Sequence, residues 1–396
     1  MHVLVTVHPA HSHLNPTVGI ARELQQRGHR VAYTANRLFA PVVSAQGFAV
    51  VEAGLTYTIN RLDDHFPQRT AYPVTDRDDW DVGVLFPTLA PPKLLADIRP
   101  YVEADPPDVI IRDQFEFGGY LLGELYGIPH VTVNISPAWP MAWGFFERHL
   151  YAPLHRLRAE HDLPPDNQLE SLFRYLRLDT SPPFFLPPDA PNPPTAHAFN
   201  QFKVPDNGRR SPPGWLDELP YARSVLVTLG GVWNQSDALL RLLIDSVVDR
   251  EVNVIVAMGR EVTLSGYPDH VRIEAYVPFA DLLPHLSAAA FHGGFVSFLT
   301  MMSAGIPVVI NPVGADHAIT GRLAEGLGTG LSLMPDERTP AALRQAVGRV
   351  LTEDGFRRKA QDTARRMEEL GGVRHAADLI ERVAQTKAPL HSDQPG

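Results

Sequence analysis

Three histidines follow the first apolar run of the chain at a spacing that suits acid–base chemistry. The run at residues 3–7 is typical of a buried parallel strand, and His8, His11 and His13 come directly after it. Histidine has a pKa near neutrality, so one of the three could take a proton from a substrate hydroxyl. A carboxylate would then hold the imidazole in one tautomer, and Asp113, which follows another apolar run, is the candidate.

Other interpretations of these histidines stay open at this point. A histidine at the start of a helix is often a surface or capping residue. The pair His11 and His13 could also chelate a metal, although no adjoining Asp, Glu or Cys completes such a site. His11 in place of His13 as the base is a further alternative.

A glycine-rich turn in the second half of the chain suits an anion. His292-Gly293-Gly294 follows an apolar run typical of a strand, and the apolar residues 298–304 indicate a buried helix after it. Two glycines there let a ligand approach backbone N–H groups, and the helix N-terminus adds a positive end. With side-chain donors from His292 and Ser297, the turn could hold a diphosphate without a metal. A tight turn with nothing bound is the alternative.

A second turn of this kind lies downstream, at Pro312-Val313-Gly314-Ala315-Asp316-His317, and favours the anion site over an empty turn. It also follows an apolar strand and opens a helix. Asp316 could accept hydrogen bonds from sugar hydroxyls, although helix N-capping would explain an aspartate here equally well.

Strand and helix patterns alternate along both halves of the chain. One helix is expected from an N-cap at Asn15, with Pro16 in its first position, to Gly28. Ser236 is expected to cap another, which runs to about Arg250. Strands are expected at 31–34, 108–111, 130–133, 224–229, 252–257, 271–275, 288–291 and 306–310.

A proline-rich stretch separates the two halves. Ten prolines between residues 181 and 213 indicate a stiff connector. We therefore expect two α/β domains, each a doubly wound, Rossmann-like parallel sheet, at 1–200 and 216–385. A connector at 201–215 and a loose tail at 386–396 complete the chain. Because ligands bind beyond the carboxyl ends of such strands, the expected site is a cleft between the domains.

Together these motifs resemble the family 1 glycosyltransferases of the GT-B fold, in the bacterial branch that glycosylates macrolides, enediynes, polyketides and other natural products. The resemblance spans nearly the whole chain. The segments that carry it are His13-Leu14-Asn15-Pro16, Arg27-Gly28-His29, Pro107-Asp108, Asp113, Gly127-Ile128-Pro129, Tyr276-Val277-Pro278, His292-Gly293-Gly294 with Ser297, Ala304-Gly305-Ile306-Pro307, Pro312, Ala315-Asp316-His317 and Gly328.

The resemblance implies an inverting, metal-independent hexosyl or deoxyhexosyl transferase. It needs no cofactor and uses a nucleoside-diphosphate sugar as co-substrate. By the family pattern His13 is the base and Asp113 its partner. The donor diphosphate is assigned to His292, Gly293, Gly294 and Ser297, and the donor's sugar and nucleotide to Gly230, Tyr276, Val277, Asp316 and His317.

Departures from the family pattern affect which nucleotide sugar is expected as the donor. Phe279 and His317 stand where glutamine is usual, and Val296 stands where glycine or asparagine is usual. Thr300 stands where many members carry a glutamate that binds the ribose hydroxyls. Loss of that carboxylate is compatible with a deoxyribose nucleotide, so a dTDP-deoxysugar is preferred over a UDP-sugar.

Aromatic residues predict the acceptor site. They are Phe115, Phe117, Trp139, Trp143 and Phe145. As a group they are expected to line an apolar pocket for a planar or macrocyclic aglycone, although any single one could equally belong to the core.

Composition excludes several other classes. The chain has 396 residues, no cysteine and a formal net charge of -10. The lack of cysteine excludes disulfides and thiolate chemistry and fits a reducing cytoplasm. The densest basic group, at 357–366, is interleaved with acids, as on a solvated helix rather than a nucleic-acid surface. No apolar run is long enough to span a membrane, and the first residues do not form a signal peptide.

The sequence therefore predicts an enzyme of antibiotic or other secondary metabolism that binds a small apolar aglycone and a nucleotide sugar, with no nucleic acid. A homodimer stays open, because nothing in the sequence indicates the oligomeric state. A nucleotide-sugar epimerase is an alternative that would convert the donor without an acceptor. A non-catalytic activator of a glycosyltransferase is another, and it should lack the base or the diphosphate turn, which this chain keeps.

Overall fold

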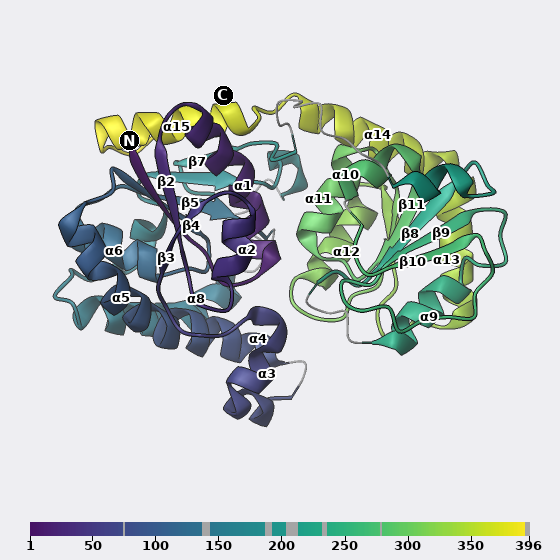
Figure 1. Ribbon diagram of the computed structural model, residues 1–396, viewed down its shortest axis with the longest axis horizontal. Helices are drawn as coiled ribbons and strands as arrows, with labels where there is room; N and C mark the ends of the chain where they lie inside the picture. The colour runs from purple at the N-terminus through teal and green to yellow at the C-terminus, as the bar shows by residue number, and fades with distance from the viewer. Residues whose placement is uncertain are drawn as a thin grey trace. The chain divides into compact units, whose positions relative to one another are not determined.

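The chain forms two compact units of parallel sheet and helix (Figure 1). The computed structural model describes residues 1–73, 76–136, 143–186, 192–202, 213–231, 236–277 and 279–392. The first unit comprises Met1–Val204 and Leu370–Gly396, and the second comprises Pro205–Glu369. Each contains one sheet whose paired strands are all parallel. The predicted fold class of two doubly wound α/β domains is confirmed.

The first unit is built on a seven-stranded sheet, here called sheet A, in the order β3-β2-β1-β4-β5-β6-β7. Its strands are β1 (His2–Thr6), β2 (Arg30–Ala35), β3 (Ala49–Glu52), β4 (Val109–Asp113), β5 (His130–Asn134), β6 (Leu176–Asp179) and β7 (Ala196–Ala198). Its helices are α1 (His11–Gln26), α2 (Ala40–Ala45), α3 (Leu62–His65), α4 (Arg77–Trp80), α5 (Ala90–Ala104), α6 (Gly118–Tyr126), α8 (Trp143–Ala159) and α15 (Val373–Thr386), with a π-helix η4 (Asp81–Leu89) and short 3₁₀ turns that include η5 (Glu170–Phe173).

The two faces of sheet A differ in chemistry. The face toward α1 and α15 is an apolar core of alternate strand residues such as Val3, Val5 and Ile111. On the opposite face, strand register places Thr6, Arg112, Thr132 and Arg177 in one row across β1, β4, β5 and β6. All four side chains are buried, and their polar groups therefore need hydrogen-bond partners inside the protein.

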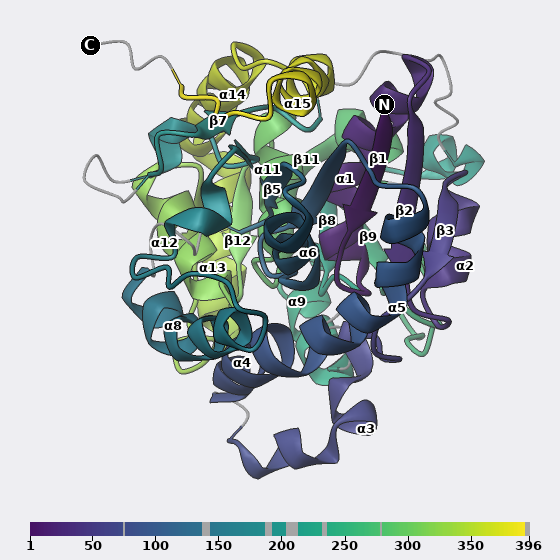
Figure 2. The ribbon, with the colours of Figure 1, turned by 90° about the vertical axis from the view of Figure 1, so that its left-hand side faces the viewer.

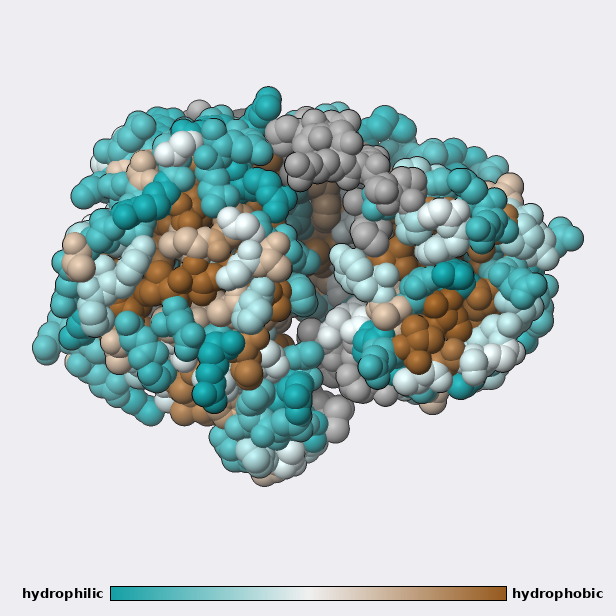
Figure 3. All heavy atoms as spheres, viewed as in Figure 1, coloured by the Kyte–Doolittle hydropathy of each residue, from teal (hydrophilic) through white to brown (hydrophobic). Residues whose placement is uncertain are grey.

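The C-terminal helix α15 belongs to the first unit. Its apolar side, which includes Val373, Ile380 and Val383, joins the core on sheet A, while the surface drawn in Figure 3 is hydrophilic along its outer side. Arg27 also holds it, donating to Asp378 at 2.7 Å and to Glu381 at 2.9 Å. A strongly amphipathic helix needs an apolar surface to cover, and here that surface is sheet A with α1.

This arrangement corrects the predicted boundaries. The second domain was expected to reach residue 385, but the second unit ends at Glu369. Residues 386–396 were expected to be a loose tail. Leu390 is instead buried, with its N–H donating to the Tyr175 carbonyl, and the Ser392 N–H donates to Pro194. Amphipathic periodicity predicts a helix but does not tell which domain it covers.

The start of α1 also differs from the prediction. The helix begins at His11 after an extended Ala10, so Asn15 and Pro16 lie inside it and Asn15 is not the N-cap. A proline beyond the first turn costs one backbone hydrogen bond, and packing of Leu14, Ile20 and Leu24 in the core offsets that loss. The predicted end is confirmed, since Gly28 follows the helix with a φ of 85°.

The second unit is built on sheet B, with six strands in the order β10-β9-β8-β11-β12-β13. Its strands are β8 (Ser224–Thr228), β9 (Asn253–Ala257), β10 (Val271–Glu274), β11 (Leu286–Phe291), β12 (Val308–Ile310) and β13 (Gly330–Ser332). Its helices are α9 (Asp237–Asp245), α10 (Phe279–Leu282), α11 (Phe295–Ser303), α12 (His317–Gly326), α13 (Pro340–Thr352) and α14 (Asp354–Glu368). Ser236 caps α9 as predicted, accepting a hydrogen bond from the Leu239 N–H at 3.2 Å.

Helices enclose sheet B, with α9 and α13 contributing to one apolar core against β8, β9, β11 and β12. Figure 1 shows α11 and α12 on the other side, and Figure 2 gives the view at right angles. The basic group at 357–366 lies on α14, where Arg358 and Arg365 form ion pairs with Asp354 and Asp362, as predicted for a solvated helix. Across the described residues, we find no helix with the length and apolarity needed to cross a membrane.

Candidate active site

His13 and Asp113 lie together at one edge of sheet A. His13 is in the first turn of α1, directly after β1, and Asp113 is the last residue of β4, the neighbouring parallel strand. The distance from His13 Nδ1 to Asp113 Oδ2 is 3.1 Å, and both side chains are buried. The two predicted residues therefore form a pair at the carboxyl ends of strands, where ligands of such sheets bind.

Asp113 is held as a carboxylate. Its Oδ2 accepts the His8 N–H at 2.8 Å, and its Oδ1 accepts the Phe115 N–H at 2.8 Å. Burial alone would raise the pKa of Asp113, but the charge and contact of His13 and the donors of His8 outweigh it and hold that pKa below its usual range. A permanent negative charge therefore faces His13 Nδ1.

The other two histidines of the segment have different surroundings. His11 is exposed, and its ring lies against Phe39 with centroids 6.0 Å apart. The structure thus brings His13, and not His11, to Asp113. His8 is buried beside the pair: its ring contacts the Tyr57 hydroxyl and the Phe115 carbonyl. The sequence indicates His8 only as one of three candidate bases and does not predict these contacts, because its partners lie far along the chain.

The aromatic residues near this pair differ in part from the prediction. The centroid of the Phe115 ring lies 6.4 Å from that of His13. Phe117 is fully buried and packs under the Arg112 guanidinium, so it belongs to the core and not to an acceptor pocket. Phe86 of η4, which the prediction missed, lies 4.3 Å from His8 and 5.7 Å from Phe115 between ring centroids. Trp139 and the side chains of Trp143 and Phe145 lie outside the described residues.

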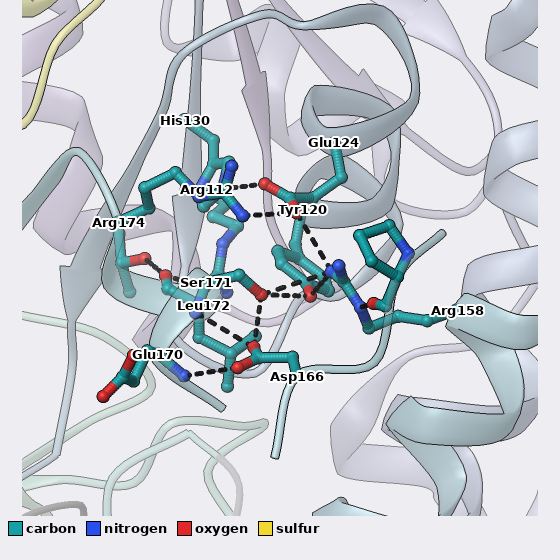
Figure 4. Close-up of polar contacts among 12 residues, drawn as sticks. Arg112, Tyr120, Glu124, His130, Arg158, Asp166, Glu170, Ser171, Leu172 and Arg174 are labelled. Carbon is teal, nitrogen blue, oxygen red and sulfur yellow. Dashed lines mark hydrogen bonds and ion pairs between the residues drawn. The ribbon is translucent and has the colours of Figure 1, made fainter. Parts of the chain in front are cut away.

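Arg112, the residue before Asp113, lies beside Tyr120 and Leu172 in a buried polar network (Figure 4). Arg112 is fully buried and donates to the carbonyls of Asp113, Gln114 and Glu116, while its other amino group donates to Leu172 at 2.7 Å. Burial lowers the pKa of Arg112 to about 10, so the side chain stays charged at neutral pH. One rigid guanidinium therefore ties the turn after β4 to the η5 segment.

The predicted diphosphate turn lies at the carboxyl end of β11. Gly293 has a φ of 99°, and Gly294 is the N-cap of α11 without a side-chain cap. The backbone N–H groups that open α11, including that of the half-buried Ser297, have no acceptor within the helix. The backbone and the helix end therefore present donors of the kind that bind anions in other proteins.

His292 occupies the space that two glycines leave. A Cβ added at Gly294 would lie 2.5 Å from His292 Nε2, and one added at Gly230 would lie 2.7 Å from its Cε1. Burial lowers the pKa of His292 to about 4. The imidazole is therefore neutral at pH 7, and the positive potential at this turn comes from the helix end.

The remaining predicted donor residues divide into two groups. His317 opens α12, and its buried ring packs against His292 with centroids 4.7 Å apart, while half-buried Asp316 is the N-cap of α12. Gly230, His292 and His317 thus form one cluster with the Gly293–Gly294 turn. Tyr276 is 78% exposed, whereas Val277 is buried.

Four buried histidines make stability depend on pH. Burial lowers the pKa to about 4 for His8, His130 and His292, and lowers that of His317 well below 6.5. Below about pH 6.5 the unfolded chain binds these protons and the folded chain does not. We expect the unfolding free energy to fall by about 1 kcal/mol per histidine for each pH unit between about 6.5 and 4.

Urea unfolding at a series of pH values measures this effect. These histidines contribute no slope above about pH 7, where they are neutral in both states. An unfolding free energy that stays constant from about pH 6.5 to 4.5 would contradict the expectation.

Within the described part of the chain, no three His, Asp or Glu side chains gather closely enough to hold a metal ion. His11 is exposed, whereas Nδ1 of His13 faces Asp113.

Two units of parallel sheet and helix, with an imidazole–carboxylate pair at the edge of one sheet and a glycine turn at the edge of the other, have the architecture of the GT-B fold. Comparison with known proteins gives the family. The chain belongs to the erythromycin biosynthesis protein CIII-like family, whose N-terminal domain model matches residues 22–230 and whose C-terminal domain model matches residues 241–370.

Individual relatives agree with this assignment. The L-demethylnoviosyl transferase of Streptomyces niveus is 30% identical over 92% of this chain and 95% of that protein. Among solved structures, the spinosyn forosaminyltransferase SpnP has a TM-score of 0.79 at 25% identity, covering 97% of this chain and 99% of that one. The glycosyltransferase VinC, solved in complex with dTDP, has a TM-score of 0.77 at 22% identity, covering 97% and 100%. The predicted class, a family 1 glycosyltransferase that acts on natural-product aglycones, is confirmed.

Proposed function

We propose that the enzyme transfers a deoxysugar from a dTDP-sugar, with inversion and without a metal, to a hydroxyl of a largely apolar aglycone. The observation that carries this proposal is the buried pair of His13 and Asp113 at the edge of sheet A. The first unit is proposed to bind the acceptor and the second to bind the donor.

His13 is the proposed general base. With Nδ1–H directed at the Asp113 carboxylate, the neutral imidazole carries its lone pair on Nε2. Nε2 takes the proton of the acceptor hydroxyl as its oxygen attacks the anomeric carbon on the face opposite the diphosphate. Asp113 then stabilises the imidazolium that forms, and direct displacement inverts the anomeric centre.

The turn before α11 is proposed to hold the leaving diphosphate. N–H groups at the start of α11 and the positive helix end stabilise the charge that develops as the sugar departs, the task a metal performs in other enzymes. Asp316 and His317, at the start of α12, are proposed to contact the sugar, with Gly230 close by.

The dTDP preference is supported by Thr300. Its hydroxyl donates back to the Val296 carbonyl at 2.8 Å, inside its own helix, so the position offers the nucleotide no carboxylate. A pocket without that group gains nothing from a ribose 2′-hydroxyl. The dTDP bound in the VinC structure is consistent with this preference, and a UDP-sugar is the competing donor.

Phe115 and Phe86 support an apolar acceptor. Their rings lie against the His13–His8 pair, so a hydroxyl brought to His13 would be carried by a molecule that contacts aromatic faces.

A thermal-shift panel tests the donor assignment. We expect dTDP and dTDP-sugars to raise the melting temperature more than UDP and UDP-sugars at equal concentration, because a ligand stabilises the folded state according to its affinity. A larger shift with the uridine series would overturn the dTDP preference.

Incubation of dTDP-sugar with and without an aglycone, followed by product analysis, tests transfer. Conversion of the donor in the absence of acceptor would point instead to an epimerase.

A further inference from the structure

His8 makes three polar contacts with residues far from it in the chain. Its backbone N–H donates to Asp113 Oδ2 at 2.8 Å, the same oxygen that faces His13. Its ring Nε2 lies 2.9 Å from the Phe115 carbonyl, and its ring Nδ1 lies 2.6 Å from the Tyr57 hydroxyl. One buried residue thus connects the end of β1, the turn after β4 and the segment after β3.

These contacts determine the tautomer of His8. A backbone carbonyl can only accept, so Nε2 must carry a proton. In the neutral ring Nδ1 then holds a lone pair, and the Tyr57 hydroxyl donates to it. Each polar atom of the neutral ring has a partner.

The surroundings keep this ring neutral. Phe86 packs against it with centroids 4.3 Å apart, and the His13 ring meets it edge-on at 5.6 Å. The titratable groups that face it are Asp113 from β4, His13 from α1 and Tyr57 from the segment after β3. Burial, with a smaller effect from His13, lowers the pKa of His8 to about 4, although Asp113 opposes that shift.

We propose that His8 is a positioning residue for the His13–Asp113 pair: a neutral imidazole, with its proton on Nε2, that fixes the turn from Asp113 to Phe115 in the orientation facing His13. The side chain itself does not touch the substrate. It acts by holding the Phe115 carbonyl, and through it the backbone whose N–H binds Asp113 Oδ1. The kinetic part of this proposal rests on the proposed function, whereas the structural part does not.

The structural part is tested by NMR on the whole wild-type protein with nitrogen-15 labelled histidine. We expect ring nitrogen shifts of a neutral Nε2–H tautomer for His8, unchanged from about pH 5.5 to 8.5, because its pKa of about 4 lies below that range. An Nδ1–H tautomer, or a titration within that range, would overturn the proposal even if the enzyme is active.

Two variants of His8 separate positioning from packing. His8→Leu fills similar space but leaves the Phe115 carbonyl without its donor, and His8→Gln offers an amide N–H in its place. For His8→Leu we expect kcat about tenfold lower with an unchanged donor KM, and changed ring nitrogen-15 shifts of His13. For His8→Gln we expect most of the loss in kcat to be restored and the His13 ring shifts to return toward the wild-type values.

Equal behaviour of the two variants, whether both wild-type-like or both impaired, would overturn the positioning role. If His8→Leu does not fold, Tyr57→Phe replaces it, since it removes only the hydroxyl that binds Nδ1. Tyr57→Phe should change the His13 ring nitrogen shifts in the same direction by a smaller amount, and no change would count against the proposal. Absence of any transfer by the wild type, with the His13 ring shifts responding as expected, would refute the proposed function and leave the positioning role supported.

Discussion

Replacing His13 with alanine is expected to lower the rate of sugar transfer by about a hundredfold to ten-thousandfold, the range that a general base contributes. The variant loses the ring whose Nδ1 lies 3.1 Å from Asp113 and, with it, the proposed acceptor of the hydroxyl proton. Donor binding should be nearly unchanged, because the turn proposed to hold the donor lies in the other unit. Initial rates at saturating donor, together with dTDP affinity, measure the two effects separately.

His11→Ala is the matched control for this variant. It removes a histidine two positions away in the same helical turn, but that side chain is exposed and lies against Phe39. Its transfer rate should stay close to that of the wild type. A His13→Ala enzyme as fast as the wild type would refute the assignment of the base, and a slow His11→Ala enzyme with an active His13→Ala would move the role to His11.

Asp113→Asn tests the carboxylate without changing the size of the side chain. An amide has one acceptor oxygen, so it keeps only one of the two bonds from the His8 and Phe115 N–H groups. It no longer stabilises an imidazolium, and an amino group in the Oδ2 position would present an N–H to His13 Nδ1. The wrong His13 tautomer would then place the proton on Nε2, where the lone pair is needed. We expect kcat to fall nearly as far as in His13→Ala. A wild-type kcat would show that the charge of Asp113 has no role.

The sequence predicts that His13 and Asp113 form a pair, because each of them follows an apolar run typical of a strand. Parallel strands end at the same edge of a sheet, so residues directly after two strands approach one another when those strands are neighbours. The pattern does not tell that β1 and β4 are adjacent in sheet A. Periodicity alone does not predict that His13 pairs with Asp113. That prediction comes from the resemblance to the family.

The residues that the sequence does not place correctly are those whose surroundings depend on contacts between distant segments. His8 pairs with Tyr57 and Phe115, and Phe86 reaches His8 from a π-helix, so no local spacing marks them. Phe117 was placed in the acceptor pocket because it is aromatic and close to Asp113. Its burial under Arg112 follows from how α6 packs on the sheet, which the sequence pattern does not specify.

Replacing Gly293 with alanine is expected to weaken nucleotide binding at least tenfold and to destabilise the second unit by about 2–4 kcal/mol. A φ of 99° is unfavourable for any residue with a Cβ. That Cβ would also lie 2.7 Å from Ile310 Cγ2 and 3.1 Å from His317. The turn must therefore shift, and the N–H groups that open α11 shift with it.

Gly231→Ala provides the matched control, since an added Cβ there meets nothing within 4 Å. It changes a glycine of the loop after β8 without strain, so stability should change by less than about 0.5 kcal/mol. Urea unfolding and calorimetric titration with dTDP, at a temperature where each variant is fully folded, measure stability and affinity independently. If Gly293→Ala is destabilised but binds dTDP as tightly as the wild type, the turn is a structural feature only, and the nucleotide must bind elsewhere. Loss of affinity in the folded Gly293→Ala protein, absent from Gly231→Ala, would place the diphosphate on the N-terminus of α11.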